Sequence, residues 1–171
     1  MAPFLLRRGW TWARWRSHDG LMTVAAWLRR VPLTITMALV VLGVALATGA
    51  LWNPLAGRSL GRVLEYGLPA FEDGRWWTLF TGSFVAVQPV QYIPILLGLL
   101  AFGGLAEYLL GTRKAALAIV VCQVFAVLGT AVLLMLNCDH GYQWATDLAR
   151  QVDAGPSAGF LGAAAAASAV L

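Results

Sequence analysis

The segment Asp153-Ala-Gly-Pro-Ser-Ala-Gly-Phe-Leu-Gly162 carries the strongest chemical signal in the sequence. Its serine, Ser157, follows Pro156, which suits the first turn of a helix because its missing N–H costs no hydrogen bond there. A hydroxyl at a helix N-terminus can attack a carbonyl carbon, since free backbone N–H groups and the helix dipole stabilise the developing oxyanion. Small residues equally suit close packing between membrane helices, and this segment provides Gly155, Gly159 and Gly162. The segment therefore predicts either a nucleophilic serine or a tightly packed helix start.

Glu107 is the second candidate, because it is an ionisable residue near the end of an otherwise apolar stretch. Gly103, Glu107 and Gly111 recur every four residues and therefore share one face of a helix. Carboxylates at this depth face protein or the interface rather than lipid. The apolar stretches hold no second carboxylate that would support a proton relay or an ion site. We therefore expect Glu107 to be a buried, hydrogen-bonded or capping group.

The elements that position these residues are long apolar stretches. Of the 171 residues, 60% are hydrophobic and 12% are charged, whereas soluble domains have about 45–50% and about 25%. This composition excludes intrinsic disorder, and two cysteines exclude a disulfide scaffold. Neither cysteine has a metal-type partner nearby, so we expect no metal. The net charge of +4 does not indicate nucleic acid, because the basic residues lie beside the apolar stretches.

Four apolar stretches are candidate membrane spans, at residues 31–51, 92–110, 115–136 and 158–171. The first three are long enough for a hydrocarbon layer of about 30 Å, at about 1.5 Å of helix per residue. The fourth is still apolar at its last residue and covers only about 21 Å, so we expect it to continue in a longer protein. The predicted fold class is an all-α integral membrane protein. Its helical bundle would occupy residues 31–171, with four spans visible and the fourth incomplete.

Residues 1–30 form a lead-in that is rich in arginine and tryptophan and holds half of the 12 Lys and Arg residues. Tryptophan prefers the headgroup level and arginine an anionic inner leaflet, so we expect the lead-in to lie on such a bilayer surface. The turn Arg113-Lys114 is basic, whereas the 137–157 connection is acidic. The positive-inside rule then predicts a multi-pass protein with a cytoplasmic N-terminus, in a bacterial inner or plasma membrane. Ser157 would enter the membrane from the outer face.

Three segments, in this order, resemble the rhomboid family of intramembrane serine proteases. Residues 74–81, Gly-Arg-Trp-Trp-Thr-Leu-Phe-Thr, look like the family's tryptophan-arginine loop between its first two spans. Residues 103–111 look like the end of its second span, and residues 155–159 lie where its G-x-S motif opens the fourth span. The resemblance covers roughly residues 31–171. The matching positions are Trp77, Gly103, Glu107, Gly111, Gly155, Ser157 and Gly159.

This resemblance implies a compact bundle of six or more helices that cleaves transmembrane protein substrates near the outer membrane surface. Ser157 would be the nucleophile, and one histidine on the sixth span would act as general base and then as acid. The resemblance implies that no cofactor is involved. His18 is in the cytoplasmic lead-in and His140 is in the outer connection, and we expect neither to replace that histidine. The 171-residue chain alone is therefore expected to be inactive.

Several positions depart from the family pattern. Thr78 stands where arginine commonly follows the tryptophan, and Ala158 stands where glycine is expected after the serine. Gln91 and Ile95 stand where family members often place a histidine and an asparagine that hold the oxyanion. Gln91 can donate a hydrogen bond and is the oxyanion candidate, but Ile95 cannot. The loss of one such donor lowers the rate by about 10²–10³ in soluble hydrolases.

Three hypotheses for the function remain open. The chain belongs to an active rhomboid-type protease, to an inactive rhomboid-like protein that binds transmembrane clients, or to the membrane module of a larger enzyme, for example a lipid-modifying one. Ser157 and its glycines favour the first hypothesis. Thr78 and Ile95 favour the other two.

Overall fold

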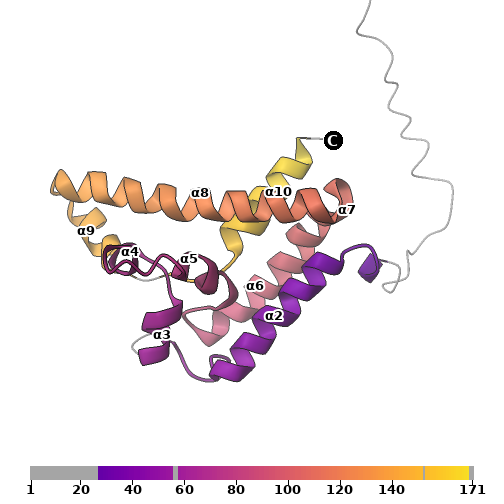
Figure 1. The fold of residues 1–171 in the computed structure, drawn as a ribbon, viewed down its shortest axis with the longest axis horizontal. Helices are drawn as coiled ribbons and strands as arrows, with labels where there is room; N and C mark the ends of the chain where they lie inside the picture. The colour runs from indigo at the N-terminus through magenta and orange to yellow at the C-terminus, as the bar shows by residue number, and fades with distance from the viewer. Residues whose placement is uncertain (1–26, 56–57, 152, 170–171) are drawn as a thin grey trace, which may run out of the picture.

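The computed structural model describes residues 27–55, 58–151 and 153–169. Their regular secondary structure is helical (Figure 1), apart from one isolated β-bridge. The predicted all-α class is therefore confirmed for this part of the chain. Most of the predicted lead-in lies outside the described residues. The elements are α2 (Pro32–Thr48), α3 (Ser59–Leu64), α4 (Leu68–Glu72), α5 (Thr78–Thr81), η2 (Gly82–Phe84), η3 (Pro89–Gln91), α6 (Tyr92–Gly98), η4 (Leu99–Gly103), α7 (Gly104–Leu110), α8 (Thr112–Asp139), α9 (Gln143–Ala149) and α10 (Ser157–Ser168).

Among the described residues, two helical stretches are long and apolar enough to cross a membrane. One is Pro89–Leu110, which has 22 residues and runs from η3 to α7, and the other is α8, which has 28 residues. The mean hydropathy of their most apolar parts is 1.9 and 2.6. Only 28% and 22% of those parts is buried inside the molecule. Their apolar side chains therefore face mainly outward.

The first predicted span, 31–51, is a shorter helix than expected. Helix α2 has 17 residues and ends at Thr48, because Gly49 adopts a left-handed conformation with φ 69°. The N–H groups of Gly49 and Ala50 then bond back to carbonyls of the last helical turn, at 3.1 and 2.9 Å. Glycine takes this conformation at no steric cost. The predicted boundary was wrong because apolar residues continue past a helix stop.

The other predicted boundaries shift by a few residues. The second stretch begins at Pro89 instead of residue 92, and α8 extends past both ends of 115–136. Gly111, with φ 79°, separates the two stretches and makes the turn between α7 and α8. Helix α10 begins at Ser157, one residue before the predicted start.

The connections between the long helices contain short helices of their own. Residues 52–83 include α3, α4 and α5, and the acidic connection includes α9. The β-bridge joins these two connections, since Tyr66 and Asp153 exchange backbone hydrogen bonds of 3.0 and 2.8 Å. The residues just before α10 are thereby tied to the chain just before α4.

Helix α10 crosses α8 at very short range (Figure 1). A Cβ atom at Gly159 would lie 2.9 Å from the carbonyl oxygen of Ile119, and one at Gly162 would lie 2.5 Å from Cβ of Cys122. Because real Cβ atoms do not approach so closely, only glycine permits this contact at either position. The predicted packing role of these small residues therefore holds at the crossing.

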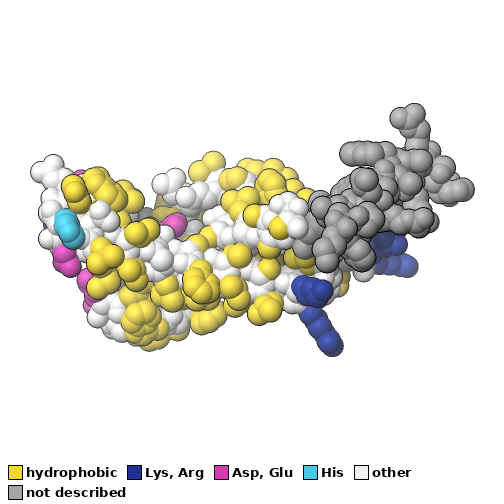
Figure 2. All heavy atoms as spheres, turned by 90° about the horizontal axis from the view of Figure 1, so that it is seen from above, with side chains coloured by type: hydrophobic (Ala, Val, Ile, Leu, Met, Phe, Trp, Pro, Cys, Tyr) yellow, Lys and Arg dark blue, Asp and Glu magenta, His cyan; other side chains and the backbone are white. Residues whose placement is uncertain are grey.

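On one face of the molecule, charged side chains are separated along its length (Figure 2). On the face that Figure 2 shows, lysine and arginine gather at the end with the α7–α8 turn. Aspartate, glutamate and histidine lie toward the other end, and apolar side chains cover much of the surface between. This arrangement matches the separation of basic and acidic segments in the sequence.

Candidate functional site

Ser157 is the first residue of α10, and its exposed side chain lines a cavity of about 450 Å³. Gln91, the predicted oxyanion residue, lines the same cavity from the end of η3. Polar side chains of Gln88, Thr130 and Asp153 line it as well. The fold thus places the predicted nucleophile and the predicted donor, which are far apart in sequence, around one hollow.

The start of α10 leaves two backbone N–H groups available beside the serine. The first N–H groups of a helix have no partner within the helix. The N–H of Gly159 donates to Oε1 of Gln123 at 2.9 Å, and that of Phe160 donates to the carbonyl of Pro156 at 3.2 Å. For the N–H groups of Ser157 and Ala158, the described part of the chain offers no hydrogen-bond acceptor. Both residues line the cavity, so these donors can serve an oxyanion there.

The backbone before the serine is held by three separate parts of the fold. The carbonyl of Gly155 accepts a 3.1 Å hydrogen bond from the hydroxyl of Tyr66 and a 3.0 Å hydrogen bond from Nε2 of Gln123. The N–H of Gly155 donates to the carbonyl of Gly82 at 2.8 Å. Gly155 has φ 132°, a backbone conformation that favours glycine. These bonds fix the chain immediately ahead of Ser157.

The Tyr66 hydroxyl keeps its proton and so remains a donor. Burial raises the pKa of Tyr66, and the negative charge of Asp153 raises it further, because both disfavour the phenolate. The hydrogen bond to Gly155 therefore persists over the neutral pH range.

Sequence reasoning missed Gln123 and Tyr66 as parts of this site. A signal for Gln123 was present, since it is one of two polar side chains within the uncharged 115–136 stretch. A buried amide requires hydrogen-bond partners, and Gln123 is 5% exposed. Tyr66 gave no comparable signal, because its partner lies 89 positions away in the sequence.

The two positions aligned with the family's oxyanion residues differ in their surroundings. Oε1 of Gln91 accepts the N–H of Gln88 at 2.9 Å, which leaves the amide nitrogen as a donor near the cavity. Ile95 is instead buried in an apolar cluster with Tyr92 and Ala154. It therefore supplies packing and no hydrogen bond.

Glu107 is buried, 1% exposed, and accepts four hydrogen bonds. Its Oε1 accepts the N–H of Leu33 at 2.9 Å and the hydroxyl of Thr112 at 2.8 Å. Its Oε2 accepts the N–H and the hydroxyl of Thr34, at 2.8 and 2.9 Å. This carboxylate caps the first turn of α2 from the neighbouring helix, as expected for a structural group. Gly103 lies one helical turn before Glu107, at the end of η4. A Cβ atom at this position would lie 3.1 Å from the Leu99 side chain, so the packing there is tight.

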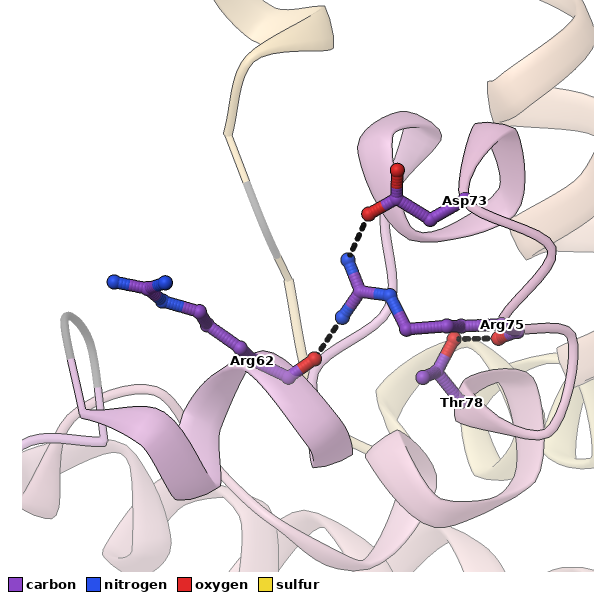
Figure 3. Close-up of polar contacts among 4 residues, drawn as sticks. All are labelled: Arg62, Asp73, Arg75 and Thr78. Carbon is purple, nitrogen blue, oxygen red and sulfur yellow. Dashed lines mark hydrogen bonds and ion pairs between the residues drawn. The ribbon is translucent and has the colours of Figure 1, made fainter.

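The segment that resembles the tryptophan-arginine loop is held together by Arg75 (Figure 3). The guanidinium of Arg75 donates to the carbonyl of Arg62 and pairs with Asp73 at 2.8 Å. Thr78 is buried, and its hydroxyl donates to the carbonyl of Arg75 at 2.7 Å. Trp77 has an exposed side chain. Thr78 and Arg75 thus give this loop its internal order.

Histidine is absent from the described residues that line the Ser157 cavity. His140 is exposed at the end of α8, where Nδ1 lies 2.6 Å from the carbonyl oxygen of Leu136. His18 lies outside the described residues. The described residues also contain no group of three or more metal-ligating side chains.

No protein-family model, curated protein or solved structure matches this chain.

Proposed function

We propose that this chain is part of a rhomboid-type intramembrane serine protease with Ser157 as its nucleophile. The observation that carries this proposal is the start of α10. There the Ser157 hydroxyl and two available backbone N–H groups share a cavity with the amide of Gln91. A nucleophile and oxyanion donors around one cavity are what acyl transfer requires.

Membrane insertion is supported by the apolar surface of the two long helices. A soluble protein would bury helices this apolar in its core, yet less than a third of their most apolar parts is buried here. Exposed apolar side chains along them include Ile93, Leu97, Leu117 and Phe125. The hydrogen bonds of Glu107 to the start of α2 fit a structural role for the glutamate of the segment that resembles the end of the rhomboid second span.

In the proposed reaction, Oγ of Ser157 attacks the scissile carbonyl carbon of a transmembrane substrate and transfers its proton to a general base. The carbonyl oxygen becomes an oxyanion, which the N–H groups of Ser157 and Ala158 and the amide of Gln91 stabilise. Collapse of this tetrahedral species breaks the peptide bond, and the base returns the proton to the leaving amine. Water that the same base deprotonates then hydrolyses the remaining acyl-serine ester, which releases the second product and restores Ser157. The base would be a histidine on a later span of the full-length protein, as in the family that the sequence resembles.

The test uses the full-length protein in membranes with a transmembrane reporter substrate. Ser157→Ala is expected to abolish cleavage and to abolish labelling by a fluorophosphonate probe, with unchanged expression. Ser168→Ala is the matched control, because Ser168 is also on α10 but its hydroxyl donates to its own helix, to the carbonyl of Ala165. Cleavage that survives Ser157→Ala would overturn the proposal.

The second candidate is an inactive rhomboid-like protein that binds transmembrane segments. It is favoured by Ile95, which fills with a buried apolar side chain the position of a family oxyanion donor. In that case the wild-type protein would neither cleave the reporter nor react with the probe. It would still retain the reporter in a detergent pull-down, and Ser157→Ala would leave that binding unchanged.

A further inference from the structure

We propose that Gln123 is a positioning residue for Ser157, a role that rests on the proposed function. Its side-chain amide makes one hydrogen bond to the backbone before the serine and one to the backbone after it. Nε2 donates to the carbonyl of Gly155, two residues before Ser157, at 3.0 Å. Oε1 accepts the N–H of Gly159, two residues after Ser157, at 2.9 Å. One side chain thus holds both ends of the turn on which the nucleophile stands.

The chemistry of the two partners fixes the orientation of the amide. A backbone carbonyl only accepts and a backbone N–H only donates, so one of the two amide orientations satisfies both bonds. Gln123 is 5% exposed, and an amide that is buried without hydrogen-bond partners destabilises the fold. Both ends of the amide are therefore committed to this turn.

Close helix packing brings the turn within reach of Gln123. At Gly159 the α10 backbone lies against α8, where a Cβ atom would come within 2.9 Å of the Ile119 carbonyl oxygen and 3.3 Å of Oε1 of Gln123. Neither Gln123 nor Gly155 lines the Ser157 cavity. Gln123 instead lines a second, smaller cavity of about 80 Å³, together with Pro156. It supports the turn from behind and does not touch the site of reaction.

The two hydrogen bonds have electrostatic consequences for the serine. The Gly155 carbonyl, a partial negative charge, is directed to Gln123 and Tyr66 and is kept from the cavity where an oxyanion would form. The N–H of Gly159 is saturated, so within the described part of the chain the donors left at the helix start are those of Ser157 and Ala158. Gln123 therefore determines which backbone dipoles face the reacting carbonyl.

The test compares Gln123→Met and Gln123→Glu with the wild-type full-length protein in membranes. Methionine has a similar size and makes neither bond, and we expect kcat and the rate of fluorophosphonate labelling to fall about 10- to 100-fold, with KM within about twofold. The carboxyl introduced by Gln123→Glu can replace both bonds only when protonated. The activity of that variant relative to wild type should therefore rise as pH is lowered. The neighbouring ionisable groups, Tyr66 and Asp153, are present in both proteins and cancel in this ratio.

Thr34→Val is the control for a merely structural effect, because it removes one hydrogen bond to the Glu107 carboxylate and none at the serine. It should lower the melting temperature and leave kcat unchanged.

A Gln123→Met protein with unchanged kcat and labelling rate would overturn the positioning role, while loss of cleavage in Ser157→Ala would still support the protease. If Gln123→Met does not fold, a Gln123→Glu activity ratio independent of pH would overturn it. A wild-type protein without Ser157-dependent cleavage would overturn both proposals.

Discussion

Oε2 of Glu107 lies 2.8 Å from the backbone nitrogen of Thr34 and 2.9 Å from its hydroxyl oxygen, although the two residues are 73 positions apart in the sequence. The N-cap residue of α2 makes no side-chain hydrogen bond. The Glu107 carboxylate on α7 caps α2 instead, because it accepts the free N–H groups of the first turn of α2. The two helices are joined at this end by charge-assisted hydrogen bonds, which are stronger than bonds between neutral groups.

Glu107→Gln should therefore lower the stability of the protein. An amide has only one acceptor atom. Its NH₂ group would therefore face N–H or O–H groups that now donate hydrogen bonds to the carboxylate. We expect the free energy of unfolding to fall by about 3 kcal/mol, because one or two hydrogen bonds to a charged group are lost, at about 1.5–3 kcal/mol each. The measurement is thermal unfolding in detergent, with the exposed Glu72→Gln as control. A change in reporter specificity at unaltered stability would contradict the capping role.

Gly159→Ala should separate α10 from α8, since the added Cβ would lie 2.9 Å from the Ile119 carbonyl oxygen. Overpacking of this kind costs about 1–3 kcal/mol, and the shift would also weaken the bonds of Gln123 to the serine turn. Gly129→Ala is the matched control on α8, because no neighbouring atom lies within 4 Å of the place that its Cβ would take. Stability by thermal unfolding should fall for the first variant and stay level or rise by up to about 1 kcal/mol for the second. Equal stability of the two variants would refute the close contact.

Glu65 should make stability depend on pH. Its side chain is buried, and within the described part of the chain Oε1 has no hydrogen-bond partner, so desolvation raises its pKa. The folded protein then binds a proton that the unfolded chain releases above about pH 4.3. Stability contributed by the protonated form is complete below that value and is lost as pH rises through the raised pKa.

Glu65→Gln should remove this dependence, leaving a flatter profile and a higher melting temperature at neutral pH than wild type. Melting temperatures from pH 4 to pH 8 in detergent would measure it. Parallel profiles for the two proteins would show that Glu65 does not titrate as expected.

The two cysteines offer a direct test of the proposed orientation. Cys138 is near the end of α8, in the acidic connection that should face outward, whereas Cys122 packs against Gly162 at the helix crossing. In intact cells, a membrane-impermeant maleimide should label the Cys122→Ser protein, which retains Cys138. The Cys138→Ser protein should be labelled only after denaturation. Labelling of Cys138 only in opened cells would reverse the predicted topology.

The helical class and the start of α10 could be predicted because they follow from local patterns. Apolar runs predict helices, and Pro156 before Ser157 marks a helix start. Glu107 was also interpretable, since a lone carboxylate at the end of an apolar helix needs donors. The exact donors, Leu33 and Thr34, depend on how two distant helices meet and could not be predicted.

The hydrogen bonds around the serine turn could not be predicted from the sequence. Gln123, Tyr66 and Gly82 reach Gly155 from three different elements, and no spacing rule connects them. The end of α2 was missed for a different reason. Hydropathy does not register the left-handed Gly49, so backbone conformation stopped the helix before the apolar residues did.

The π-helical turn Leu99–Gly103 changes the phase of the helix that contains it. In an α-helix, residues five apart point about 140° away from each other, whereas the i to i+5 bonds of a π turn stack them. Gly98 and Gly103, five positions apart, accordingly both face Phe160, at 2.9 and 3.7 Å from their ideal Cβ positions. After removal of one residue from this turn, the two glycines would be four positions apart in a regular α-helix and would point about 40° away from each other. The π turn therefore accommodates one extra residue in this helix while both glycines keep their close contact with Phe160 on α10.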